Sequence, residues 1–249
     1  MTVSIARRKP LLAGLVFSAA WVVGLAIFSS STRVRASGTE VLAGYAGHQG
    51  VAAAQFVLTE VVTAVVLAVV ALSLARAGLR AGADPRLVGA VRITGVGAAT
   101  IAAIQGVLGV ALTTWAVSGG HAGAAGALSE TISRLDGVKM FVLAALALAG
   151  GALGVLPRWL RAVGFALAAA IVVSGVGYLF LLDGPATAAW VSLPLLMAWV
   201  TGAGSVAATT TRPPRRSWTY VRDVPEVPGN ESKIGAPGGA SDAARGRGA

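Results

Sequence analysis

Six uninterrupted apolar runs constrain the fold of this chain more than any other feature of its sequence. A helix rises about 1.5 Å per residue, so roughly 20 apolar residues suffice to cross a hydrocarbon core of about 30 Å. The runs are rich in Ala, Val, Leu and Gly and lack the two-residue alternation of outer-membrane barrel strands. The sequence therefore predicts an all-α, polytopic membrane bundle with six transmembrane helices. The predicted spans are 11–30, 55–75, 93–117, 140–156, 162–182 and 186–208.

The composition agrees with a membrane-embedded chain and excludes several kinds of chemistry. Hydrophobic residues make up 55% of the chain and charged residues only 12%, about half of the average for soluble domains. The net charge of +10, in so apolar a chain, indicates membrane orientation rather than nucleic-acid binding. The absence of Cys excludes disulfides, thiolate metal sites and cysteine nucleophiles. We expect the lipid bilayer as the main partner, and neither a metal nor a cofactor.

The basic residues are distributed unequally between the two sides of the predicted bundle. Twelve flank the span ends that share one side, and only four fall on the other. Because cytoplasmic loops carry an excess of Lys and Arg, this bias places both termini in the cytoplasm of a bacterial cell, which requires an even number of spans. The first group is Arg7, Arg8, Lys9, Arg76, Arg80, Arg86, Arg92, Arg158, Arg161, Arg212, Arg215 and Arg216, and the second is Arg33, Arg35, Arg134 and Lys139.

The first apolar run has a second interpretation as a cleaved signal peptide, because Arg7, Arg8 and Lys9 precede it. Against cleavage, the run is longer than an ordinary signal peptide and residues 34–36 make a poor cleavage sequence. We expect this segment to be retained as a transmembrane span. If it were cleaved, five spans would remain.

The composition changes abruptly near the C-terminal end. Pro, Gly and Ser are frequent there and apolar residues are few, so this part cannot bury enough surface to offset its ordering entropy. The sequence predicts a six-helix transmembrane domain at 1–209 and a disordered cytoplasmic tail at 210–249.

The loop at 118–139 is long enough to fold on the outer side. Leu128, Ile132 and Leu135 recur on one helical face, and Glu130 and Arg134 are spaced as an i,i+4 ion pair. We expect a short surface helix that ends at Asp136-Gly137, a typical turn sequence.

Glu60 is the strongest chemical signal, because it is the only charged residue well inside a predicted span. An ionisable side chain within a membrane is costly and marks a functional site by default. Counting helical rise from the basic ends puts Gln105, Ser174 and Tyr178 in the same outer-half layer, on the third and fifth spans. Thr59 and Thr63 extend the polar face of Glu60's own helix.

Two roles for Glu60 stay open. With no Lys or Arg expected at its depth, its carboxyl should be largely protonated, and we expect it to approach Gln105 across the second and third spans. A protonated carboxyl bonded to Gln105 serves as a structural pin between two helices. The same group serves equally well as a ligand-binding or proton-handling site.

Glycine and histidine motifs carry weaker signals. Gly95-x-Gly97 and Gly175-x-Gly177 lie inside apolar helices, so close helix packing explains them better than nucleotide binding, as it does Gly150-xxx-Gly154. The two histidines, His48 and His121, fall on the outer side. Exposed loop positions are the simpler interpretation, although two imidazoles can also ligate a metal or haem.

Part of the chain resembles a known group of proteins. Pro157-Arg158-Trp159-Leu160, Ser174-Gly175-Val176-Gly177-Tyr178 and Trp190-Val191-Ser192-Leu193-Pro194-Leu195-Leu196 resemble small six-span membrane proteins of unassigned function from GC-rich bacteria. The chain contains 17 Arg and only 3 Lys, an excess of Arg that agrees with a GC-rich genome. The resemblance covers residues 158 to 204, implies fold and compartment, and transfers no catalytic residue.

The leading functional hypothesis is a non-enzymatic bundle that binds or passes a small or lipophilic solute, or supports a membrane complex, with Glu60 in its polar layer. The alternative is an integral-membrane enzyme that uses Glu60 as a general acid on an apolar substrate, such as a terpene (polyprenyl) cyclase. Aromatic faces would then stabilise the carbocation, a role open to Trp21, Trp115, Tyr178 and Trp199. The acidic and aromatic signature expected of such cyclases is missing around Glu60, which places the enzyme second.

Overall fold

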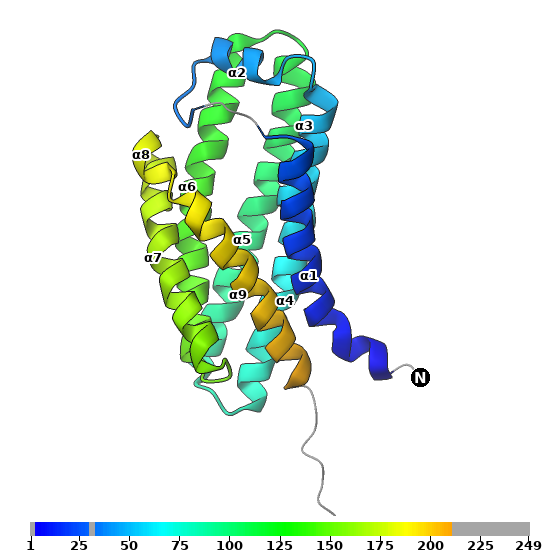
Figure 1. Cartoon of the computed structure of the whole chain (residues 1–249), viewed down its shortest axis with the longest axis vertical. Helices are drawn as coiled ribbons and strands as arrows, with labels where there is room; N and C mark the ends of the chain where they lie inside the picture. Colours follow the sequence, from blue (N-terminus) through cyan, green and yellow to red (C-terminus); the bar gives the residue numbers. More distant parts are fainter. Residues whose placement is uncertain (1–2, 30–32, 211–249) are drawn as a thin grey trace, which may run out of the picture. The chain divides into compact units, whose positions relative to one another are not determined.

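The computed structural model describes residues 3–29 and 33–210, and the predicted tail beyond residue 210 lies outside these residues. All regular elements in the described part are helical (Figure 1). Six helical segments are long and apolar enough to cross a membrane, which confirms the predicted number of spans. They are Lys9–Ile27, Gln49–Arg80, Pro85–Val117, Ala122–Ala152, Arg158–Phe180 and Asp183–Thr209.

Several spans consist of more than one element, because short π-helices interrupt the second and end the third. The elements in chain order are α1 (Val3–Ile27), α2 (Gly38–Tyr45), α3 (Gln49–Phe56), η1 (Val57–Val62), α4 (Thr63–Arg80), α5 (Pro85–Ala111), η2 (Leu112–Val117), α6 (Ala122–Ala152), α7 (Arg158–Phe180), α8 (Asp183–Ala186) and α9 (Ala189–Thr209).

Sequence features explain where several elements begin and end. Ser37 caps α2 in a capping box with Glu40, and Asp84 caps α5 just before Pro85, which suits the first helical position. Leu181, in the left-handed region at φ 56°, ends α7, and α8 and α9 follow directly. Across this short connection, α7 and α9 pack against each other.

The fourth span differs most from its prediction. Helix α6 begins at Ala122 and runs without a break for 31 residues, about 46 Å, so the predicted surface helix and the predicted span at 140–156 are one element. Asp136-Gly137 does not end a helix. Gly137 lies inside α6, and its lack of a side chain allows α7 to approach closely, because a Cβ there would stand 2.6 Å from the backbone nitrogen of Leu179. The predicted Glu130–Arg134 pair is confirmed, at 2.6 Å.

Close helix packing accounts for most of the glycines singled out in the sequence. A Cβ on Gly95 would stand 2.2 Å from the Cβ of Ala71, and one on Gly150 would stand 2.9 Å from the Trp199 ring. The prediction was wrong for Gly154, which lies beyond α6 with φ +75° and has nothing within 4 Å of a Cβ.

Helices α1 and α9 pack closely over much of their length, and Figure 1 shows them side by side. A Cβ on Gly204 would stand 2.4 Å from the carbonyl oxygen of Pro10, and one on Gly14 would stand 2.8 Å from the Cα of Thr201. Ser18 and Thr201 share a 2.9 Å hydrogen bond across the same contact. Small residues and hydroxyl bonds of this kind hold membrane helices together.

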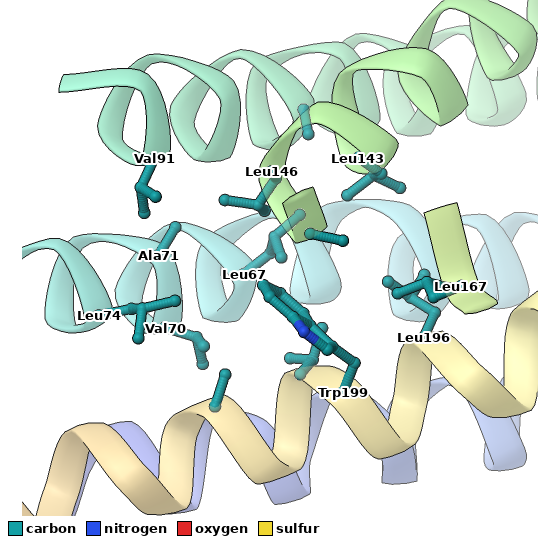
Figure 2. Close-up of a cluster of buried hydrophobic side chains, with 14 of the residues drawn as sticks. Leu67, Val70, Ala71, Leu74, Val91, Leu143, Leu146, Leu167, Leu196 and Trp199 are labelled. Atoms are coloured by element: carbon teal, nitrogen blue, oxygen red, sulfur yellow. The ribbon is translucent and has the colours of Figure 1, made fainter. Parts of the chain in front are cut away.

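The main hydrophobic core lies where α4, α5, α6, α7 and α9 meet. In Figure 2, Trp199 points from α9 into a cluster that includes Leu67, Leu74 and Leu146. These side chains are at most 4% exposed, so this part of the bundle is filled by apolar groups.

Candidate functional site

Three ionisable side chains meet inside the bundle. The Nζ atom of Lys139 lies 2.8 Å from Oε2 of Glu60 and 2.8 Å from Oδ1 of Asp136. The side chains of Lys139 and Glu60 are 8% and 10% exposed, and that of Asp136 is 21% exposed. We refer to Glu60, Asp136 and Lys139 as the charged cluster.

The charged cluster corrects the expectation that Glu60 has no basic partner. The sequence interpretation assigned Lys139 to an outer loop because Asp136-Gly137 resembles a turn. Since α6 continues through these residues, one helical turn separates Asp136 from Lys139, and both side chains reach the interior. The i,i+3 spacing of two opposite charges directly before an apolar run was the signal that could have revealed them. The ion pair at 2.8 Å therefore gives Glu60 a basic partner that the sequence interpretation did not provide.

A π-helix presents Glu60 to this cluster. Glu60 lies in η1, between α3 and α4, and π-helical turns of this kind occur frequently at functional sites. The hydroxyl of Thr59 donates to the carbonyl of Gln55, and that of Thr63 donates to the carbonyl of Thr59. The two predicted threonines therefore bond to the helix backbone rather than to the Glu60 carboxylate.

Gln105 reaches the cluster through Asp136. Its Nε2 donates to Oδ1 of Asp136 at 3.3 Å and to the carbonyl of Ile132 at 3.1 Å. In the described part of the chain no hydrogen bond joins Gln105 to Glu60, so the predicted pair is linked only through Lys139 and Asp136. Gln105 is 1% exposed, and its Oε1 has no partner among the described residues.

A pocket of about 340 Å³ opens beside the charged cluster. All three cluster residues line it, together with the aromatic side chains of Phe17, Trp21, Tyr178 and Trp190. Its walls come from α1, from η1 and α4, and from α5 to α9. Volume and lining resemble those of small-molecule sites, which combine apolar and aromatic walls with a few converging polar groups.

The predicted site residues divide into three groups. Glu60, Thr63, Trp21 and Tyr178 line the pocket. Gln105, Ser174 and Thr59 are buried but do not line the pocket. Ser174 donates a hydrogen bond to the sulfur of Met140, which does line it. The methyl group of Thr59 packs against Gly24 of α1, where any larger side chain would collide with it.

The two remaining tryptophans lie elsewhere. Trp115 is 57% exposed in η2 with its ring near His121, and Trp199 fills the hydrophobic core (Figure 2). Sequence reasoning missed four lining residues that belong to three different helices: Phe17 of α1, Asp136 and Lys139 of α6, and Trp190 of α9.

The histidines lie apart from the charged cluster. His48 is exposed near the Phe28 ring, and His121 is exposed near Trp115. Among the described residues there is no group of three or more His, Asp and Glu side chains arranged to hold a metal ion.

No family model matches this chain, and no match is found among curated proteins or among solved structures.

Proposed function

We propose that this multi-pass protein is a non-enzymatic membrane bundle that binds a small lipophilic solute in the pocket beside Glu60, Asp136 and Lys139. The observation that carries the proposal is the pairing of a buried charged cluster with an aromatic pocket in one place. Six membrane-compatible helices supply the setting.

The energetics of buried charges favour a binding role over a purely structural one. Ionisable groups within a membrane bundle are costly, and buried ion pairs add little net stability compared with apolar packing of the same volume. The chain packs apolar side chains tightly around Trp199, a short distance along the same helices. Retaining three ionisable groups beside a cavity is therefore better explained by a polar ligand group that meets them.

The mouth of the pocket favours entry from the apolar part of the membrane. Among the residues that line the pocket, Trp190 of α9 is 74% exposed, and Leu193 of α9 and Leu25 of α1 are half-buried, so we take this side of the pocket as its mouth. Because a bilayer covers exposed apolar side chains of this bundle, a lipophilic solute can reach the pocket without crossing the aqueous phase. The positive-inside bias puts this mouth in the outer half of the membrane.

The alternative enzyme hypothesis has less support. A general acid must present its proton to the substrate, and the carboxyl of Glu60 is already engaged by Lys139 at 2.8 Å. Of the four aromatic residues proposed to stabilise a carbocation, Trp115 and Trp199 lie away from the pocket.

Photolabelling tests the proposal. The probe is a C12 fatty alcohol that carries a diazirine, added to the protein in nanodiscs of phosphatidylcholine. We expect labelling to concentrate on pocket residues such as Trp21 and Leu193, and to be lost there when Ala189→Trp fills the pocket. The matched variant Ala166→Trp, on the exposed face of α7, should keep the labelling. Uniform labelling of all exposed apolar faces, unaffected by Ala189→Trp, would overturn the proposal.

A further inference from the structure

We infer that the solute bound in this pocket is a lipophilic amine in its ammonium form, whose positive charge balances the charged cluster. This inference rests on the proposed function and names the class of its ligand.

The first step is a charge balance. Two carboxylates, Glu60 and Asp136, face one ammonium group, Lys139, so the ionised cluster has a formal charge of −1. Among the described residues that line the pocket, no other cationic side chain is present. Arg134 precedes Lys139 by five residues on α6. Its side chain is exposed and pairs with Glu130 instead of joining the cluster. An unbalanced charge in a bundle interior is costly, so a monocation is the ligand that this site stabilises best.

The second step concerns the unused acceptor atoms. Lys139 bonds to Oε2 of Glu60, and Lys139 and Gln105 bond to Oδ1 of Asp136. Within the described part of the chain, no hydrogen bond reaches the other carboxylate oxygen of either residue. Two free acceptors next to the pocket suit a ligand with N–H donors, and charge-assisted hydrogen bonds are the stronger kind.

The third step concerns the walls. Trp21, Tyr178 and Trp190 give the pocket aromatic faces, which attract cations and also accommodate an apolar chain. The Nε1 atom of Trp21 is buried and has no partner among the described residues, so it offers a donor to an oxygen on the same ligand. Charge, acceptors and aromatic walls thus point to one chemistry, an ammonium head on an apolar body.

The experiment compares three C12 probes that share one chain: dodecylamine, dodecanol and dodecyltrimethylammonium. Binding to the protein in phosphatidylcholine nanodiscs is measured by calorimetry at pH 7, with empty nanodiscs subtracted. We expect dodecylamine to bind at least about tenfold more tightly than dodecanol, which corresponds to about 1.4 kcal/mol. Dodecyltrimethylammonium, which lacks N–H donors, should fall between them.

Variants link this preference to the cluster. Asp136→Asn and Glu60→Gln each bring the formal charge to zero, so each should remove the preference for the amine. Glu130→Gln removes an exposed carboxylate and should leave the preference unchanged. Melting curves show whether each of the three variants still folds. If one cluster variant does not fold, the other still allows the comparison with Glu130→Gln.

The outcomes separate the inference from the proposed function. Equal binding of dodecylamine and dodecanol would overturn the inference and leave the proposed function standing, with a proton as the balancing cation. An amine preference that Glu130→Gln reduces as much as Asp136→Asn would also overturn it, because surface charge would then be the cause. Absence of binding by all three probes would contradict the proposed function itself.

Discussion

At the scale of single residues, Lys139 holds the site together, because it is the one cation between two carboxylates. The sequence analysis missed its buried position because it gave the turn-like pair Asp136-Gly137 more weight than the i,i+3 spacing of Asp136 and Lys139. Asp136-Gly137 has the composition of a turn, yet α6 continues through both residues and Gly137 lies against α7. Glu60, by contrast, is recognisable in sequence because a charge inside an apolar run of this length is rare. Its partners are contributed by a helix far along the chain.

Replacing Lys139 by Met should strongly destabilise the protein. The substitution keeps a long unbranched side chain but leaves Glu60 and Asp136 without a counter-charge. Breaking a buried ion pair in this way costs about 3–5 kcal/mol. The matched control Arg134→Met breaks an exposed pair on the same helix and should cost less than about 1 kcal/mol. Reversible unfolding in detergent measures both; similar values for the two variants would contradict the buried cluster.

Glu40 gives a pH prediction outside the spans. The backbone N–H and the hydroxyl of Ser37 donate to its carboxylate, and these bonds lower the pKa of Glu40 below its ordinary value of 4.5. A lowered folded pKa stabilises the protein above pH 4.5, and that contribution is lost as the pH falls through the folded pKa. We expect Ser37→Ala to raise the pKa of Glu40 toward 4.5 in an NMR titration of carbon-labelled Glu. A wild-type midpoint at or above 4.5 would be inconsistent with the capping box.

At the scale of elements, hydrophobic length predicts the six spans well, because each must cover the same bilayer thickness. The two π-helices could not be predicted in this way. Helices α1 and α5 pack against η1, and we attribute its π-helical turn to these tertiary contacts. No periodicity in the sequence predicts such a turn.

The close approach of α6 and α7 predicts the effect of Gly137→Ala. The added methyl would collide with the backbone of Leu179 and with Gly175, and overpacking of this kind costs about 1–3 kcal/mol. Gly89→Ala is the matched control within a helix, because nothing lies within 4 Å of its Cβ. Higher helix propensity should make that variant neutral or stabilising by up to about 1 kcal/mol. Melting temperatures of the two variants decide the point, and a neutral Gly137→Ala would refute the close contact.

At the scale of the whole molecule, charge distribution sets the orientation that we propose. The twelve-to-four excess of basic residues predicts that both termini lie in the cytoplasm. Reporter fusions at Gly120 and at Gly235 should therefore show opposite sidedness in cells, with Gly235 inside. Matching signals from the two positions would refute the six-span topology, and reversed signals would move the mouth of the pocket to the other half of the membrane.

Single-cysteine protection tests most directly whether a solute occupies the pocket. The chain has no Cys, so Ala189→Cys at the pocket and Ala166→Cys on the exposed face of α7 each introduce one thiol. The rate of modification by a membrane-permeant maleimide is measured with and without saturating dodecylamine or dodecanol. We predict that at least one probe slows the reaction of Ala189→Cys about tenfold or more and leaves Ala166→Cys unchanged. Equal rates at Ala189→Cys with and without both probes would contradict the proposed binding site.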